Sequence, residues 1–252
     1  MILSYDGSLP GFLCILGHAL KTYPQWSEVR NLAESPLSSL FGQEQEIATD
    51  YDFADKVVSG LGKKLGKQFP NKLAYAFSSE WQGIEADLIK ITGRALKRGR
   101  PCLDQLSDPL VQRFQSAAFR TAREKHRLLG LLRFSRLQDD CFLAQVKPQA
   151  NVVPFLGAHF ARRFSDQRWG IVDTKRRIAL FGAGPEWSLE SQVEIAADLS
   201  FHHSETAIVN LWKSFYKHIS NPDRYNPQLR RQFMPKRYWS NLTEMQPEEP
   251  MK

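Results

Sequence analysis

Two patterns of apolar residues divide the chain. After a short apolar stretch at residues 1–5, predicted to be a strand, apolar residues recur every three or four positions, as on one face of a helix. This period predicts helices over the following segments: 9–20, 50–65 with Asp50 or Asp52 as N-cap, two within 71–99, and 108–127. Residues 24–50 contain Pro24, Pro36 and Gly42 and are predicted to be irregular.

Beyond residue 127, short apolar stretches come in pairs joined by polar turns, which is typical of β-hairpins. One hairpin is predicted to turn at Gln138-Asp139-Asp140, between the stretch ending at Phe134 and Cys141–Val146. A second is predicted within Trp169–Gly182, turning near Thr174-Lys175. Helical segments are predicted around these hairpins at the following positions: 151–164 with Asn151 as N-cap, 189–199, and 205–219.

The order of helices, hairpin, helix, hairpin and helices predicts an α+β fold. We expect a mostly antiparallel sheet of two hairpins with helices packed around it. We predict a single domain over residues 1–245, with a helical N-terminal lobe at about 8–127 and a sheet-bearing part at about 128–245. Residues 246–252 are acidic and contain proline, and we predict that they form a frayed tail.

Composition and charge narrow the class of partner. The chain has 252 residues, of which 42% are hydrophobic, and this is ample for a globular core. A net charge of +7 favours an anionic partner, such as nucleic acid, an acidic protein or a membrane surface. No apolar run approaches the roughly 20 residues that span a bilayer, and the start lacks the cationic segment of a secretory signal. We therefore predict a cytoplasmic protein without a membrane partner.

The cysteines do not predict a metal or redox site. Cys14, Cys102 and Cys141 are odd in number and widely spaced, so they form neither a CxxC motif nor a disulfide framework. A reducing compartment is the simplest interpretation. We predict no metal and no cofactor.

Four residues are candidate catalytic groups, for acid–base chemistry or metal binding. Glu124 and His126 lie in EKHRLLGLLRF at a predicted helix-to-strand junction, His159 on a predicted helix, and Asp173 on a predicted strand. They would act together only if they converge in a cleft. His159 is alternatively a core histidine with a backbone partner. The chain contains no GxSxG, HExxH, Walker or GxGxxG motif, so a role that is non-catalytic on its own is favoured.

Arg133 is predicted to lie on a strand, next to Phe134. If that face of the strand is buried, the arginine needs a carboxylate partner, because an unpaired buried charge is costly. Asp173 is the first candidate partner of Arg133 or of His126. A structural ion pair that braces the sheet and an anion-binding role remain equal alternatives for Arg133.

The stretch NPQLRRQFMPKRYW, residues 226–239, interleaves cations with aromatic residues. Asn226 and Pro235 predict the start and the end of a helix. Leu229, Phe233 and Met234 are expected to pack inward while the cations point outward. The stretch is therefore either a structural clamp with extended cationic side chains or a surface that stacks bases and contacts phosphates.

Two further basic clusters have a structural and a functional interpretation. Lys175, Arg176 and Arg177 at the predicted hairpin tip form a solvated loop or a finger that contacts phosphates. Arg162 and Arg163 near a predicted helix C-terminus favour the helix dipole without any ligand. Over the whole chain we predict the following nucleic-acid-binding residues: Arg127, Arg133, Arg162, Arg163, Arg176, Arg177, Arg230, Arg231, Lys236, Arg237 and Trp239.

Together these stretches resemble a bacterial family known as the probable DNA metabolism protein family, a domain of unknown function. The resemblance covers nearly the whole chain, in the family's order, through the following segments: YDGSLPGFL, EKHRLLGLLRF, NVVPFLGAHFARRF, RWGIVDTKRRIAL and NPQLRRQFMPKRYW. Members are encoded beside a radical SAM protein associated with DNA repair, or are fused in front of a uracil-DNA glycosylase-like domain. The resemblance implies DNA as partner and an accessory role beside such a protein in DNA metabolism. The alternative is an enzyme acting on DNA.

One departure from the family pattern bears on that alternative. The resemblance implies a histidine before Asn151, where this chain has Ala150. If that histidine were a catalytic or metal-binding group, this chain would lack it. The departure weakens an enzyme assignment built on this loop.

Overall fold

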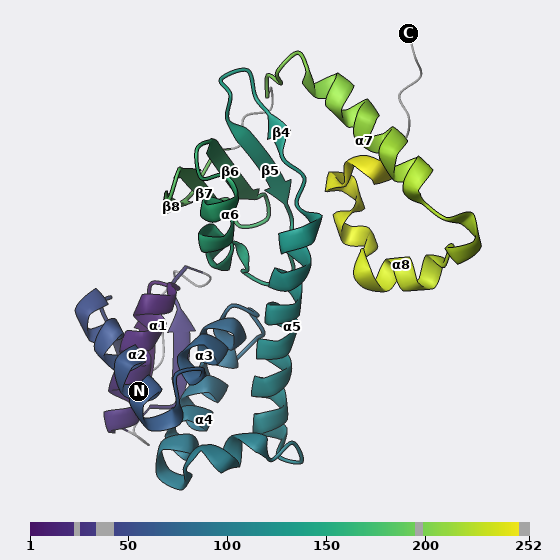
Figure 1. Cartoon of the computed structure of the whole chain (residues 1–252). Coiled ribbons are helices and arrows are strands. Elements are labelled where there is room, and N and C mark those ends of the chain that lie inside the picture. Colours follow the sequence, from purple (N-terminus) through teal and green to yellow (C-terminus); the bar gives the residue numbers. More distant parts are fainter. Residues whose placement is uncertain (23–25, 34–42, 195–198, 247–252) are drawn as a thin grey trace. The chain divides into compact units, whose positions relative to one another are not determined.

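The structure is a computed structural model that describes residues 1–22, 26–33, 43–194 and 199–246 (Figure 1). The chain divides into two compact units, unit 1 (Met1–Ala122) and unit 2 (Arg123–Lys252), and each is described by itself. In the described ranges, no helix combines the length and the apolar character that crossing a membrane requires.

Unit 1 contains a small parallel sheet and a set of helices. The strands are in the order β2-β1-β3, with both outer strands parallel to β1. Its elements are β1 (Ile2–Tyr5), α1 (Leu9–Thr22), β2 (Glu28–Asn31), β3 (Glu44–Glu46), α2 (Tyr51–Leu65), α3 (Phe69–Phe77), α4 (Ile84–Arg98), the 3-10 helix η1 (Arg100–Asp104) and the first part of α5 (Pro109–Leu131). The predicted first strand and the predicted helices are confirmed.

Two strands of unit 1 correct the expectation that residues 24–50 are irregular. β2 has the sequence EVRN and β3 the sequence EQE. Both lie at the edges of the sheet, beside the buried β1. Polar edge strands carry no apolar alternation, so their pattern did not predict them. Part of this segment, residues 24–25 and 34–42, lies outside the described residues.

Local capping explains where two of the helices begin. The Asp50 side chain accepts a hydrogen bond from the backbone N–H of Phe53 at 3.0 Å, which confirms Asp50 as the N-cap of α2. Asp108 accepts the N–H of Leu110 at 2.8 Å at the start of α5. α5 continues to Leu131 instead of ending near Arg127, because a short leucine-rich run is compatible with a helix as well as a strand.

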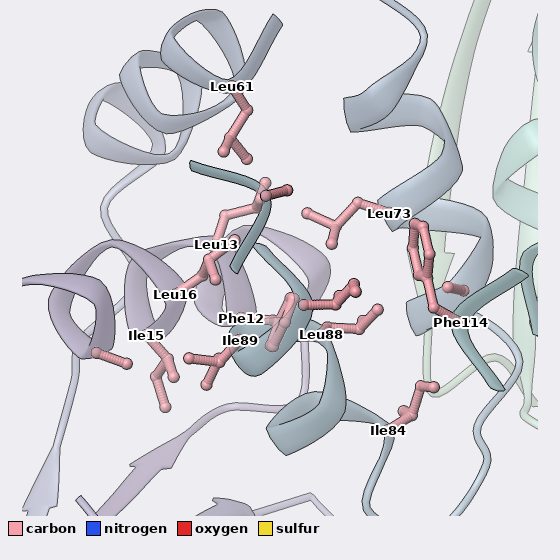
Figure 2. Close-up of a cluster of buried hydrophobic side chains, with 14 of the residues drawn as sticks. Phe12, Leu13, Ile15, Leu16, Leu61, Leu73, Ile84, Leu88, Ile89 and Phe114 are labelled. Atoms are coloured by element: carbon pink, nitrogen blue, oxygen red, sulfur yellow. The ribbon is translucent and has the colours of Figure 1, made fainter. Parts of the chain in front are cut away.

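The core of unit 1 forms where the apolar faces of its helices meet. Figure 2 shows Phe12 of α1 close to Leu88 and Ile89 of α4, with Phe114 of α5 beside Leu73. All of these side chains are buried. Burying them supplies the main favourable contribution to folding of this unit.

Unit 2 is built on a five-stranded mixed sheet in the order β4-β5-β6-β7-β8. β5 and β6 pair in parallel, and the other neighbours pair antiparallel. The strands are β4 (Ser135–Arg136), β5 (Phe142–Val146), β6 (Arg168–Asp173), β7 (Ile178–Ala183) and β8 (Glu186–Ser191). The α+β class and the hairpin predicted within Trp169–Gly182 are confirmed. The predicted turn at residues 138–140 also joins two antiparallel strands, but the first of them is β4 and not the leucine-rich stretch ending at Phe134. The expectation of a mostly antiparallel sheet is wrong, because a helical crossover joins β5 to β6.

Three local predictions in unit 2 are corrected. β8 replaces the start of the helix predicted at 189–199. The alternation of Trp187 and Leu189 with polar residues is typical of a strand. Residues 195–198 of the predicted helix lie outside the described residues. Arg133 lies between α5 and β4 and not on a strand. Asn151 does not cap a helix, since its buried Oδ1 accepts no hydrogen bond from any described residue.

The C-terminal part of unit 2 consists of helices that pack partly on its core. The remaining elements of the unit are η2 (Val153–Phe155), α6 (Gly157–Arg163), α7 (Glu205–Ile219), η3 (Pro222–Arg224), α8 (Pro227–Phe233), η4 (Lys236–Asn241) and η5 (Thr243–Met245). Tyr238 and Leu242 enter the core. Phe233, expected to point inward, is 66% exposed, and Leu229 is 49% exposed. The predicted frayed tail lies almost entirely outside the described residues.

Candidate nucleic-acid interface

Glu124 anchors the C-terminal segment of unit 2. Its buried carboxylate accepts the backbone N–H groups of Gln149 at 2.9 Å and Ala150 at 2.8 Å. It also accepts the Tyr238 hydroxyl, and Arg237 Nη2 lies 3.4 Å from its Oε1. Burial and the adjacent Glu124 carboxylate raise the pKa of Tyr238, so the phenol stays protonated and donates. The position expected from the family pattern to be histidine, Ala150, is therefore a backbone ligand of this carboxylate.

Arg176, paired with Asp173, holds the loop at residues 148–150, the same loop whose N–H groups bind Glu124. Asp173 Oδ1 accepts the N–H groups of Lys175 and Arg176, and Oδ2 is 2.7 Å from Arg176 Nη1. The Arg176 guanidinium donates to the carbonyls of Pro148 at 3.3 Å and Gln149 at 2.6 Å. The predicted pairing of Asp173 with Arg133 or His126 is wrong, because an arginine three residues along the same turn reaches it.

Arg133 has the carboxylate partner that its burial requires, and this partner is Glu244. Nη2 of Arg133 lies 2.7 Å from Oε1 of Glu244, and Nε lies 3.2 Å from Oε2. Trp212 Nε1 donates to the same Oε2 at 3.0 Å, and the guanidinium lies 5.3 Å from the centre of the Trp212 ring. These contacts connect the end of α5, α7 and η5.

The Glu244 contacts predict an acid-sensitive contribution to stability. Burial disfavours the charged form of Glu244, but hydrogen bonds from Arg133 and Trp212 outweigh it and hold the pKa below its ordinary value of 4.5. A lowered folded-state pKa stabilises the protein above the unfolded pKa, and this stabilisation is lost as pH falls through the folded pKa. Below pH 4.5 the free energy of unfolding should therefore fall more steeply in the wild type than in Glu244→Gln.

Urea unfolding at a series of pH values from neutral to acidic measures this difference. Glu186→Gln, which changes an exposed carboxylate of β8, should keep the wild-type slope. Equal slopes for Glu244→Gln and the wild type would contradict the assigned role of Glu244.

The two histidines of the candidate catalytic set lie apart from these contacts. His126 is exposed on α5, and His159 is half-buried on α6, where burial and nearby Arg162, Arg163 and Lys125 lower its pKa. Within the described residues, no hydrogen bond or ion pair joins either histidine to Glu124 or Asp173. No group of three or more His, Cys, Asp or Glu there could hold a metal ion. A catalytic role for this set stays a prediction.

The residues after α7 form a surface in which cations lie against aromatic rings. The Arg230 guanidinium lies 5.3 Å from the ring centre of Tyr225 and 5.1 Å from that of Trp239. Lys236 Nζ lies 5.9 Å from the Trp239 ring, and Trp239 Nε1 donates to the carbonyl of Met234 at 2.9 Å. We call Tyr225, Arg230, Lys236 and Trp239 the cationic stack.

Asn226 fixes the helix that presents this stack. Its side chain accepts the N–H of Leu229 at 2.9 Å, which confirms it as the N-cap of α8. Arg230 and the exposed Arg231 then fall in the last turn of α8.

The other predicted nucleic-acid-binding residues are of two kinds: arginines that contact other groups of the protein, and arginines that are exposed. Arg127 donates to the carbonyl of Gln232 at 2.8 Å, and Arg237 lies 4.7 Å from the Tyr238 ring, so both fasten the C-terminal segment. Arg162 and Arg163 are exposed in the last turn of α6. Arg177 is exposed in the turn before β7. Residues 226–239 are thus fastened to the core, but through Tyr238 and not through Leu229 and Phe233 as predicted for the clamp. The binding of nucleic acid by these cations stays a prediction.

A pocket of about 350 Å³ lies beside the cationic stack. Its lining comes from α7, α8, η5 and the residues that adjoin them: Lys213, Tyr216, Lys217, Ser220, Tyr225, Arg230, Glu244 and Gln246. The part of this lining that lies on α7 was not among the predicted binding residues. The spacing of Lys213, Tyr216 and Lys217 was an available signal, since residues three and four apart share a helix face. Most of the excess of Lys and Arg over Asp and Glu also lies in unit 2.

Comparison with known families gives one match. Residues 82–244 match the family model DUF4130, a domain of unknown function. This range is more than half of the chain, and it includes the anchoring residues Glu124, Asp173, Tyr238 and Glu244. No curated protein and no solved structure matches the chain.

Proposed function

Because the chain belongs to the DUF4130 family, a domain of unknown function, we propose its function from its own residues: binding of DNA by the surface of α8 and η4. The cationic stack carries this proposal. Arg230 and Lys236 lie against Tyr225 and Trp239, and Arg231 is exposed beside them. Proteins that bind single-stranded nucleic acid combine cations for phosphates with aromatic rings for bases in this way.

The anchoring contacts support the proposal because they hold the surface in place before any ligand arrives. Tyr238 and Arg237 are fixed on Glu124, and Arg127 is bonded to the backbone of Gln232. A surface ordered in advance loses less conformational entropy on binding. The residues that fasten the C-terminal segment therefore also favour DNA binding by the cationic stack beside them.

We assign the domain an accessory role in DNA metabolism, without catalysis of its own. Both carboxylates of the candidate catalytic set are engaged in structural contacts. Glu124 accepts the N–H groups of Gln149 and Ala150. Asp173 pairs with Arg176, whose guanidinium donates to the carbonyls of Pro148 and Gln149. The partner protein proposed is a radical SAM protein associated with DNA repair or a uracil-DNA glycosylase-like protein, and this rests on the resemblance described above. A pull-down of that partner that withstands nuclease treatment tests it, and no capture would contradict it.

The double variant Arg231→Ala/Lys236→Ala tests the DNA-binding surface. Phosphate contacts release counterions, so DNA affinity should fall linearly with salt on logarithmic axes. The variant should bind about tenfold more weakly at low salt, with a salt slope reduced by about 1 for each phosphate that is no longer neutralised. Fluorescence anisotropy of labelled single- and double-stranded oligonucleotides measures both. Arg230 and Arg237 are left unchanged because they are packed against Tyr225 and Glu124.

Lys63→Ala/Lys64→Ala is the matched control. It removes the same charge from two exposed lysines in the last turn of α2. If both double variants lose equal affinity, net charge and not this surface is responsible. Absence of DNA binding by the wild type at low salt would overturn the proposed function.

A further inference from the structure

We infer that the pocket lined by α7, α8 and η5 binds one nucleotide unit of a DNA strand, with its phosphate on Lys213, Lys217 and Arg230 and its base against Tyr225. This inference rests on the proposed DNA-binding function and names the unit that the strand would insert. A DNA strand and a free nucleotide both carry a phosphate ester next to an aromatic base, so either could supply this ligand.

The charge of the pocket favours an anion. Lys213 and Lys217 come from one face of α7, and Arg230 comes from α8. Glu244 is the one carboxylate among the described lining residues, and its side chain is 1% exposed and bonded to Arg133 and Trp212. Its negative charge is therefore already matched by Arg133. Lys217 and Arg230 therefore give the lining a positive charge that an anionic ligand would offset.

Arg230 supplies a second and independent observation. Its buried Nε has no hydrogen-bond partner within the described residues. The rings of Tyr225 and Trp239 hold the guanidinium in position without accepting a hydrogen bond from it. A buried donor without an acceptor destabilises the folded protein. Once the guanidinium turns toward the pocket, a ligand oxygen would satisfy this donor, and the other phosphate oxygens would accept hydrogen bonds from Lys217.

Size and aromatic lining distinguish a nucleotide from a simple phosphate ion. The volume of about 350 Å³ falls within the range of sites for small organic ligands. Tyr225 is 63% exposed, and Tyr216, Ser220 and Gln246 add polar groups. Stacking of a base on such a ring would strengthen binding of a nucleotide relative to a phosphate ion.

Calorimetric titration of the full chain with three probes tests the inference: a deoxynucleoside 5′-monophosphate, the matching nucleoside, and inorganic phosphate. We expect the monophosphate to bind at least about tenfold more tightly than either of its parts, since stacking and charge both contribute. Lys217→Ala should lower the affinity for the monophosphate about fivefold. Lys56→Ala, an exposed lysine of α2, is the matched control and should have no effect.

The Tyr225 variants separate stacking from charge. Tyr225→Phe keeps the ring beside Arg230 and should bind the monophosphate as the wild type does. Tyr225→Leu removes the ring. It should weaken binding of the monophosphate and change the affinity for inorganic phosphate little. Equal binding of monophosphate and inorganic phosphate, or no effect of Lys217→Ala, would overturn the inference.

Competition identifies the source of the nucleotide. An unlabelled oligonucleotide should displace the monophosphate, and failure to displace it would overturn the assignment to a strand. Arg231→Ala/Lys236→Ala should lose oligonucleotide affinity yet keep the monophosphate. If DNA still binds with the expected salt slope but the monophosphate does not bind, the pocket inference fails while the proposed function stands. If the monophosphate binds and DNA does not, the proposed function fails.

Discussion

Glu124→Ala is expected to lower the free energy of unfolding of unit 2 by about 3–5 kcal/mol, the largest effect predicted for this chain. The substitution leaves the N–H groups of Gln149 and Ala150 and the Tyr238 hydroxyl without their acceptor. It also leaves Arg237 without its carboxylate. Each buried donor that loses its partner costs about 1–3 kcal/mol.

Two measurements follow this loss. Urea unfolding gives the change in free energy, and hydrogen exchange at the amides of Gln149 and Ala150 reports the local opening of the loop. Tyr238→Phe removes a single hydroxyl and should cost about 1–3 kcal/mol, since that hydroxyl bonds a charged group. The control Glu186→Ala changes an exposed carboxylate and should stay within about 0.5 kcal/mol.

The exchange measurement also separates anchoring from catalysis at Glu124. An anchoring carboxylate protects the amides at residues 149 and 150, so Glu124→Ala should accelerate their exchange in the folded protein. Unchanged exchange, together with unchanged stability, would show that Glu124 does not hold this loop and would return it to the candidate catalytic set.

Asp173→Ala is expected to lower the free energy of unfolding by about 3 kcal/mol, the second largest effect. Asp173 is 0% exposed and is the ion-pair partner of Arg176, whose side chain is 10% exposed. Removing it takes away the counter-charge that Asp173 supplies to a buried guanidinium. The expected loss is at the lower end of the range for buried pairs, because Arg176 keeps the carbonyls of Pro148 and Gln149.

Urea unfolding measures the Asp173 effect against two comparison variants. Asp166→Ala alters an exposed aspartate before β6 and should change stability by no more than about 0.5 kcal/mol. Arg176→Met removes the cation of the pair and leaves Asp173 with its two backbone donors, so it should cost less than Asp173→Ala. If Asp173→Ala were as stable as the Asp166 control, the pair would not brace the turn.

Helices and turns were predictable from the sequence where local chemistry decides them. Asp50 and Asn226 each accept a backbone N–H three residues later, and the apolar period follows directly. The pairs of parallel strands could not be predicted from such local patterns. β2 and β3 have no apolar alternation, and the parallel register of β5 with β6 depends on a crossover that brings together strands far apart in the sequence.

The sequence indicated which side chains of the site need a partner, but not which residues supply the partners. Burial implied that Arg133 needs a carboxylate, yet Glu244 lies 111 residues away, so no local pattern could identify it. The basic aromatic stretch was recognised as a clamp or a surface, but Tyr238 and not Phe233 is the residue that packs inward. That choice depends on the acceptor that Glu124 offers deep in the unit, which a helix period does not reveal.

The long separation between these partners has a kinetic consequence. The Tyr238–Glu124 hydrogen bond closes a loop of 114 residues, and the Arg133–Glu244 pair closes one of 111. Interactions between distant positions form slowly, because the chain must give up the entropy of the open loop before the interaction stabilises it. On the ribosome, the end of α5 and the loop at residues 148–150 emerge well before their partners. Glu124 and Arg133 must therefore remain without these partners until residues 237–244 have been synthesised.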